Sequence, residues 1–289
     1  MKKSDKVKEL TEQLEKGVDE IFQTEEYKKF LDMCANLPRY SVNNQILIYN
    51  QTHGKATMVQ SFTNWKKLGR HIKKGSKAIK ILAPSFHKTS VAVKKFGKDG
   101  RPLTDKQGNE ITEEVESKYT TFFVVNTFDI SQTEGDALPD LMKVHELTGE
   151  VKNYNELFDK LVALSSVPVK IEDTGSIAKG YFNMAENIIV IKEGMSQVHT
   201  IKTLVHELTH SLLHSKESKI TRGQKEIEAE SVAYIVTKYL GIDTSDYSFG
   251  YVAGWSSSKE HEQLKESLKT ISKTAKEIIV KLEEEKEAV

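Results

Sequence analysis

The residues best suited to chemistry lie in one short stretch, Thr203-Leu204-Val205-His206-Glu207-Leu208-Thr209-His210. It contains the pattern H-E-x-x-H, and on an α-helix two positions four apart lie on one face, about one turn from each other. His206 and His210 can therefore bind one Zn²⁺ together. Glu207 can take a proton from a water on that ion, since Zn²⁺ lowers the pKa of a bound water to about 7. The pattern predicts metal-assisted hydrolysis with Glu207 as the general base.

The segments on both sides of the motif are those that such a site needs. Residues 201–213 have apolar residues at helical spacing, residues 185–191 are typical of a short buried strand, and residues 225–236 indicate a second, acidic helix. This order is typical of zinc peptidases of the zincin class. Two alternatives stay open: an ordinary amphipathic helix with two unrelated histidines, or a structural zinc site. Glu207 argues against the second, because a structural site has no use for a base beside the metal.

Three glutamates of the acidic helix compete to be the third ligand. Glu226 and Glu230 are four apart and share a face with two small alanines, whereas Glu228 points about 160° away from Glu226. We expect Glu226 to bind the metal and Glu230 to hydrogen-bond the far nitrogen of a ligating histidine. Glu228 is expected on the solvated face of the helix.

The pattern E-x-x-A from Glu226 to Ala229 resembles the third-ligand helix of gluzincin-type peptidases, including the ImmA/IrrE-like group. The resemblance implies that the first glutamate binds the metal. His214, in Leu212-Leu213-His214, resembles a residue that often follows the motif there, and we expect it at the surface or behind a ligand. Zinc is inferred from the ligand types; Mn²⁺, Fe²⁺ or Co²⁺ fit the same ligands.

Length and composition limit the classes of protein to which the chain can belong. The 289 residues leave room for two domains, and 42 basic residues balance 42 acidic ones, so net charge does not indicate a partner. The single cysteine, Cys34, excludes an internal disulfide and suits a reducing compartment. The sequence has no signal-peptide pattern and no apolar run of about 20 residues. We expect a cytoplasmic protein without a membrane partner.

The first half combines two expected helices with a strongly basic region. Residues 4–33 have the periodicity of one helix, and Ser41 is a candidate N-cap for a second helix to residue 51. Residues 55–101 contain thirteen Lys or Arg and one acidic residue, with aromatic residues in between. Strands are expected at 78–83 and 119–128, with an exposed loop at 97–114. A basic strip with aromatic rings suits single-stranded nucleic acid; the alternative is a solvated lysine face with Trp65 in the core.

The first half also resembles the N-terminal domain of ArdC-type antirestriction proteins. The matching motifs are Tyr40-Ser41-x-x-Asn44-Gln45-x-Leu47-Ile48, Trp65-Lys66-Lys67-Leu68-Gly69-Arg70, Lys73-Lys74-Gly75 and Phe128-Asp129-Ile130-Ser131-Gln132-Thr133-Glu134-Gly135. LtrC-like proteins of conjugative elements are similar overall. The resemblance implies a single-stranded-DNA-binding domain before a zincin-like domain. Our candidate DNA contacts are Arg39, Trp65, Lys67, Arg70, Lys73, Lys74 and Lys77.

The predicted architecture is therefore α+β. Residues 1–140 are expected to form the ArdC-like DNA-binding domain, 146–255 the gluzincin-like metallopeptidase domain, and 256–289 a charged amphipathic helix. That last helix has apolar residues at heptad spacing, which fits packing on the protein's own surface or on a partner.

The sequence leaves three hypotheses for the function. The main hypothesis is a protein of a mobile genetic element that binds single-stranded DNA and carries a zinc peptidase. The second is a DNA-coating protein with a structural or vestigial metal site. The third is a zinc peptidase whose protein substrate is a host repressor or restriction component.

Overall fold

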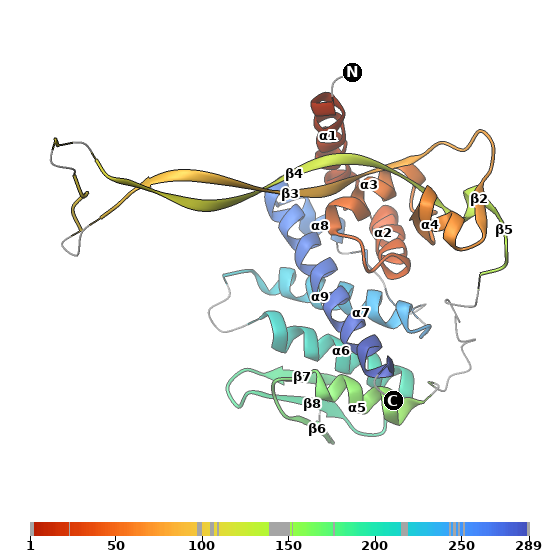
Figure 1. Cartoon of the computed structure of the whole chain (residues 1–289). Helices are drawn as coiled ribbons and strands as arrows, with labels where there is room; N and C mark the ends of the chain where they lie inside the picture. Colours follow the sequence, from red (N-terminus) through yellow and green to blue (C-terminus); the bar gives the residue numbers. More distant parts are fainter. Residues whose placement is uncertain are drawn as a thin grey trace.

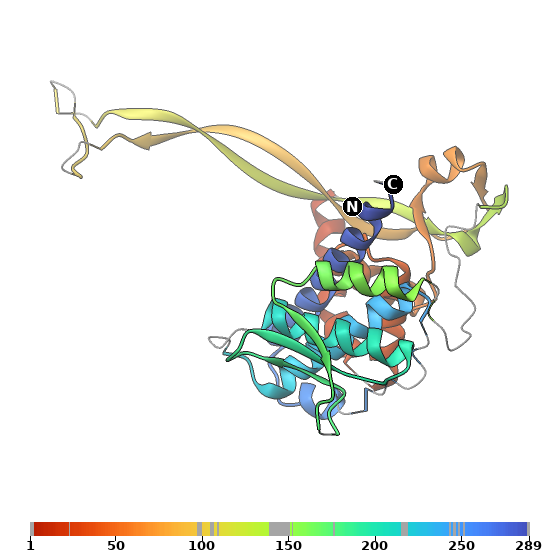
Figure 2. The ribbon, with the colours of Figure 1, turned by 90° about the horizontal axis from the view of Figure 1, so that it is seen from below.

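The computed structural model describes residues 3–22, 24–96, 100–104, 107–108, 110–138, 151, 153–175, 177–214, 219–242, 244, 247, 249–250 and 252–287. Its architecture is α+β, as the sequence predicts. Helices form the body of the molecule, a small sheet covers one end of it, and a long two-stranded ribbon projects from the other end (Figures 1 and 2).

Three helices open the chain: α1 (Lys3–Ile21), α2 (Thr24–Asn36) and α3 (Val42–Thr52). The expected single helix over 4–33 is wrong, because the chain turns after Ile21. Glu25 and Glu26 then lie in the first turn of α2, where the positive end of the helix dipole stabilises acidic side chains. The N-cap prediction for α3 is confirmed, since the Ser41 hydroxyl accepts a hydrogen bond from the Asn44 backbone N–H.

The projecting ribbon consists of β3 (Ile79–Lys94) and β4 (Thr112–Asp129). The two strands are antiparallel over sixteen residue pairs, and β1 (Val59–Ser61) pairs with the inner end of β4. Both strands are much longer than predicted. Their outer halves are exposed on both faces and lack the buried positions from which a strand is recognised in a sequence. The segment expected as a loop, 97–114, lies partly outside the described residues, and its last residues belong to β4.

The inner edge of β3 is held by amide side chains from α3. Asn44 bonds to both the N–H and the C=O of Leu82, and Gln51 does the same at Lys80. Each amide thus replaces one residue of a neighbouring strand, so the edge of the sheet is satisfied where it meets the body. This contact gives Asn44, part of the first ArdC-like motif, a structural role.

A smaller unit lies beyond β1. It contains α4 (Phe62–Lys67), β2 (Arg70–Ile72), the short 3₁₀ turn η1 (Ile130–Gln132) and β5 (Thr133–Gly135), with β2 antiparallel to β5. Asp129 organises the junction: its carboxylate accepts hydrogen bonds from the backbone N–H groups of Thr57, Met58 and Ser131. The predicted boundary at residues 140–146 lies outside the described residues.

The second half has a three-stranded sheet of order β6-β8-β7, in which β6 (Val169–Glu172) is parallel and β7 (Gly180–Asn183) antiparallel to β8 (Ile188–Lys192). Its helices are α5 (Tyr154–Ala163), α6 (Gln197–Leu213), α7 (Arg222–Tyr239) and α8 (Val252–Ser256). The strand, motif helix and acidic helix that the sequence predicts are thus present in order. Helix α6 packs on both β7 and β8 and also on α7.

The last helix, α9 (His261–Glu287), packs on the chain's own α1, α3 and α7. All its heptad-spaced apolar residues are buried: Leu264, Leu268, Ile271, Ala275, Ile278 and Leu282. Of the two expectations for this helix, the structure therefore shows packing on the protein's own surface. No described helix is long and apolar enough to cross a membrane.

Candidate metal centre

Two antiparallel helices bring the motif residues and the acidic helix together. Helix α6 begins at the N-cap Ser196 and buries its apolar face, while α7 begins at the N-cap Thr221. His206 and His210 leave α6 on the side that meets α7. There Glu226 lies within ion-pair distance of both imidazoles. Glu226, the glutamate expected to bind the metal, is therefore the one that lies beside both histidines.

The three candidate ligand atoms form a compact triangle. The two Nε2 atoms lie 3.0 Å apart, and the Glu226 Oε2 lies 3.5 Å from Nε2 of His206 and 3.7 Å from Nε2 of His210. Ligands about 2.0–2.1 Å from a tetrahedral ion are separated by about 3.3–3.4 Å, so a divalent cation fits this triangle with little adjustment. The donor set of two imidazoles and one carboxylate also leaves a fourth position open, as in catalytic rather than structural zinc sites.

Glu207 lies beside this triangle and is buried, with 7% of its surface exposed. Burial raises the pKa of its carboxyl group above the usual value, although His206 and His210 act in the opposite direction. The backbone of Phe182 in β7 hydrogen-bonds the carboxylate. A carboxylate in this position can accept a proton next to the edge strand of the sheet.

The far nitrogen of each histidine has its own partner. Nδ1 of His206 lies 3.1 Å from a carboxylate oxygen of Glu230, where the sequence placed that glutamate. Nδ1 of His210 lies 2.7 Å from Nδ1 of His214. Hydrogen bonds at Nδ1 favour the tautomer that leaves the Nε2 lone pair free for a metal. His214 is buried and supports a candidate ligand from behind, which is one of the two places expected for it.

The prediction for Glu228 was wrong. Instead of facing solvent it is 3% exposed, and its carboxylate accepts hydrogen bonds from three donors: His214 Nε2 at 3.3 Å, Gln224 Nε2 at 3.0 Å and Ser267 Oγ at 3.0 Å. Ser267 belongs to α9, which covers this side of α7. The helical period shows that Glu228 points away from Glu226, but it gives no sign that another helix lies there.

These groups also perturb one another's proton affinity in the metal-free protein. Burial lowers the pKa of His206, but its hydrogen bonds to Glu226 and Glu230 outweigh this and raise that pKa to about 10. Hydrogen bonds from His206 and His210 hold the pKa of Glu226 far below its usual value. Burial lowers the pKa of His214, so this residue is neutral and can accept the hydrogen bond from His210.

The predicted DNA contacts do not form one surface. Trp65 is completely buried and donates its indole N–H to the backbone C=O of Phe128, so it cannot stack on a base, and that prediction is wrong. Arg70 bonds to Thr133 and to backbone carbonyls of β5, and Lys73 bonds to the Ser131 carbonyl. Arg39 pairs with Glu283 of α9. Three of the predicted contacts are exposed lysines whose side chains make no such bond to any described residue: Lys67, Lys74 and Lys77.

In the folded chain, acidic residues from another segment lie beside part of the basic region, residues 55–101. Several glutamates lie at the start of β4 and just before it, and the antiparallel pairing brings them close to lysines at the outer end of β3 and just after it. Lys88 pairs with Glu116, Lys94 with Glu110 and Lys95 with Glu113. The outer ribbon is therefore close to neutral, which the count over residues 55–101 did not reveal.

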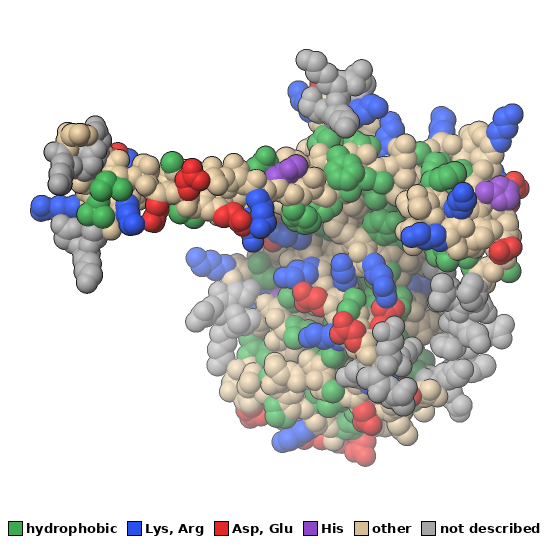
Figure 3. Space-filling model, viewed as in Figure 1, with side chains coloured by type: hydrophobic (Ala, Val, Ile, Leu, Met, Phe, Trp, Pro, Cys, Tyr) green, Lys and Arg blue, Asp and Glu red, His purple; other side chains and the backbone are tan. Residues whose placement is uncertain are grey.

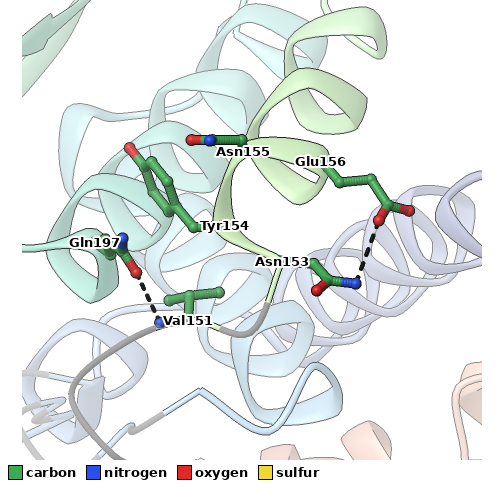
Figure 4. Close-up of a pocket in the computed structure, with 6 residues that line it drawn as sticks. All are labelled: Val151, Asn153, Tyr154, Asn155, Glu156 and Gln197. Atoms are coloured by element: carbon green, nitrogen blue, oxygen red, sulfur yellow. Dashed lines mark hydrogen bonds between the residues drawn. The ribbon is translucent and has the colours of Figure 1, made fainter.

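Two further features are separate from this centre. The described residues that line an open hollow at the start of α5 include one carboxylate, Glu156, and no histidine or cysteine; there Gln197 accepts the Val151 N–H (Figure 4). A cluster of Glu15, His261 and Glu262 joins α1 to α9. In this cluster Lys265 pairs with Glu15, and His261 with Glu15 and Asp19, so its charges are already matched.

Comparison with known proteins finds one family match in each half of the chain. Residues 4–128 match the family described as the N-terminal domain of anti-restriction factor ArdC, and residues 165–247 match the IrrE N-terminal-like domain. An uncharacterized protein of Bacillus anthracis, pXO2-81, is 26% identical over 95% of this chain. The chain spans about half the length of that relative, 51%.

Two crystal structures of the antirestriction ArdC protein from the R388 plasmid are also similar. The metal-free structure has 20% identity and a TM-score of 0.45, covering 83% of this chain and 81% of that one. The Mn(II)-bound structure has 19% identity and a TM-score of 0.47, covering 85% and 84%.

Fold, site and family matches together define a class: an α+β protein in which a second, peptidase-like domain follows a distinct N-terminal domain. Within that class its first part is similar to the N-terminal domain of anti-restriction factor ArdC, and its second part to the IrrE N-terminal-like domain.

Proposed function

We propose that the chain is a divalent-metal-dependent peptidase whose ion is held by His206, His210 and Glu226, with Glu207 as general base. The observation that carries this proposal is the ligand triangle with sides of 3.0, 3.5 and 3.7 Å beside the buried Glu207. The bound ion supplies the Lewis acidity that polarises a peptide carbonyl and activates a water. Zn²⁺ is our first choice, and Mn²⁺, Fe²⁺ and Co²⁺ suit the same ligands.

The chain's own groups divide the work. Glu207 takes the proton of the attacking water, and its burial raises its pKa toward the range that a general base needs at neutral pH. Glu230 and His214 hold the two imidazoles in place through Nδ1. Strand β7 is an edge of its sheet and reaches Glu207 through Phe182. An extended peptide added to that edge would therefore lie beside the general base, which supports a peptide as substrate.

The test compares metal content with hydrolysis in three proteins: wild type, Glu207→Gln and Glu226→Ala. Each is purified without chelators, analysed for bound metals, and incubated with casein and a mixed peptide library. We expect about one ion per chain in wild type and Glu207→Gln, hydrolysis only in wild type, and loss of the ion in Glu226→Ala. Hydrolysis by Glu207→Gln at the wild-type rate would contradict the mechanism.

A second function, single-stranded-DNA binding by the N-terminal half, is supported by a separate observation. Large aromatic rings lie open on the ribbon, among them Phe86 at 80% exposure, while Lys67, Lys74 and Lys77 are exposed near its base. Bases stack on such rings and lysines attract phosphates. A labelled oligothymidine titrated with the full chain tests this function; the absence of binding at low salt would exclude it.

The two activities together suggest how an antirestriction protein of a mobile genetic element would work in the cytoplasm: the first half holds an entering strand while the second cleaves a host repressor or restriction component. If Glu207→Gln still protects DNA in cells and no protein substrate is cleaved, the protein is instead a coat on the strand with a structural or vestigial metal site.

A further inference from the structure

The ribbon carries aromatic and basic side chains side by side on one of its faces. In an antiparallel pair, residues directly opposite each other share a face, and successive residues alternate between faces. The register pairs Pro84 with Phe122, Phe86 with Thr120 and Lys88 with Lys118, so these residues lie on the same face of the ribbon. We define the ribbon strip as Phe86, Lys88, Lys118 and Phe122. Figure 3 shows hydrophobic side chains lying open along the ribbon between charged ones.

The rings of the ribbon strip do not belong to the core. Phe86 is 80% and Phe122 53% exposed, whereas the buried apolar residues of β3, Ile79 and Ile81, lie on the alternate positions near the body. Beyond residue 83, the face that carries the even positions of β3 has two large rings in water, Phe86 of β3 and Phe122 of β4. Exposing two phenylalanines on one face is costly unless something covers them.

The spacing of the two rings fits a flat aromatic ligand. Phe122 lies opposite Pro84, so Phe86 is its diagonal neighbour, and such neighbours are separated by about 7–8 Å. Neighbouring aromatic side chains on a strand surface can each stack on one of two successive unpaired bases.

The charges of the ribbon strip favour a polyanion over other partners. Lys88 and Lys118 follow the rings on the same face and share one carboxylate, that of Glu116, at 3.2 and 4.0 Å. These three side chains together carry one net positive charge beside the rings, and Glu114 lies further out on the same face, opposite Ala92. An apolar peptide would cover the rings but would bring no anionic group to the positive charge that Lys88 and Lys118 carry in excess over Glu116.

We propose that the ribbon strip is a stacking platform for single-stranded nucleic acid, with unpaired bases on Phe86 and Phe122 and the adjoining phosphates at Lys88 and Lys118. This inference rests on the single-stranded-DNA binding proposed above and names the one face of the ribbon that would carry it. Duplex DNA is a poor ligand of the platform, because its base faces are stacked within the helix.

The test measures the anisotropy of a labelled twelve-residue oligothymidine titrated with the full chain. The variant Phe86→Ala/Phe122→Ala removes both rings, and both positions are exposed, so the fold is retained. The matched control is His87→Ala/Tyr119→Ala, which removes two stacked rings one position further out on the opposite face. We expect the first variant to lose at least tenfold in affinity and the control to lose less than twofold.

A second oligomer shows what the rings contact. An abasic strand of the same length keeps every phosphate and lacks the bases. Wild type should bind it at least tenfold more weakly than oligothymidine, and Phe86→Ala/Phe122→Ala should bind the two strands with nearly equal affinity, because the rings and the bases are partners in one interaction.

The outcomes separate the two proposals. If wild type does not bind oligothymidine, DNA binding by this chain and the platform both fail. If wild type binds and the ring variant binds equally well, the platform alone is overturned. A ring variant that changes self-association in sedimentation while its DNA affinity stays at the wild-type value would also overturn the platform and assign the face to a second copy.

Discussion

The metal centre and the β3–β4 ribbon are organised in opposite ways. At the centre, α6 and α7 are packed between the sheet and α9, and every imidazole and carboxylate has a partner from a neighbouring element. In the ribbon, β3 and β4 pair with each other, and their outer residues are exposed on both faces. The centre thus depends on the packing of the whole body, whereas the ribbon depends on its own pairing and turn. Changes at the centre should affect stability and metal together, and changes in the ribbon should affect binding alone.

The largest expected effect comes from Glu228, whose removal leaves the buried donors His214 and Ser267, and the half-buried Gln224, without this acceptor. We expect Glu228→Ala to lower the free energy of unfolding by about 3 kcal/mol and to weaken metal binding about tenfold or more. Urea unfolding and metal titration measure the two effects. Glu266→Ala on α9 is the control, since that exposed glutamate pairs only with Lys269 among the described residues. Equal stability of the two variants would show that the Glu228 network does not support the fold.

The second prediction concerns pH and metal affinity. In the metal-free protein the pKa of His206 is raised to about 10, so its imidazole is protonated at neutral pH and an ion must displace that proton. The affinity should therefore rise by up to tenfold per pH unit between pH 6 and 8, with about one proton released per ion. Calorimetric titration in two buffers with different ionisation enthalpies counts the protons. An affinity that stays constant over this range would contradict the pairing of His206 with Glu226 and Glu230.

A smaller effect distinguishes two serines of α9. Ser267 donates to Glu228, behind the metal centre, while Ser272 donates to Gln45 of α3; both are buried. Replacing either serine by Ala should cost about 1 kcal/mol of stability, the usual net contribution of one hydrogen bond. Only Ser267→Ala should also weaken metal binding, by several-fold. If the two variants bind metal alike, α9 supports the fold without tuning the centre.

The smallest effect is expected from shortening the ribbon. Joining His87 to Tyr119 through an Asn-Gly turn removes residues 88–118 and keeps the last retained pair in register. We expect unchanged metal content and a change in unfolding free energy below about 0.5 kcal/mol, measured by urea unfolding. A loss of several kcal/mol would mean that the ribbon belongs to the cooperative unit of the body, and the contrast between the two regions would disappear.

The sequence predicts the centre well because its residues are local. His206, Glu207 and His210 lie within one and a half helical turns, and the 3.6-residue period puts Glu226 and Glu230 together on one face, away from Glu228. The hydrogen-bonded residues behind them were harder to predict. His214 is one turn beyond His210, so helical spacing could have indicated its place. Ser267 comes from a helix 39 residues after Glu228, and nothing in the local pattern connects them.

The ribbon shows the converse limit. Its outer residues bury little surface, so the alternation of apolar and polar residues that marks a strand is lost although the strands continue. The ion pairs between the strands, such as Lys88 with Glu116, show that the basic segment lies against an acidic one, which the sequence order does not show. Trp65 was chosen for its lysine neighbours, but its indole N–H had a buried backbone partner that no sequence pattern shows.

Helix α9 has one consequence for how the protein is made. Its apolar stripe completes the packing of α1 and α3 as well as that of α7, with Leu268 and Ile271 fully enclosed. A chain that emerges from the ribosome in order presents these partners long before residues 261–282. The N-terminal half therefore cannot finish folding as it is synthesised, and until α9 arrives its open apolar surface is a natural client for a chaperone.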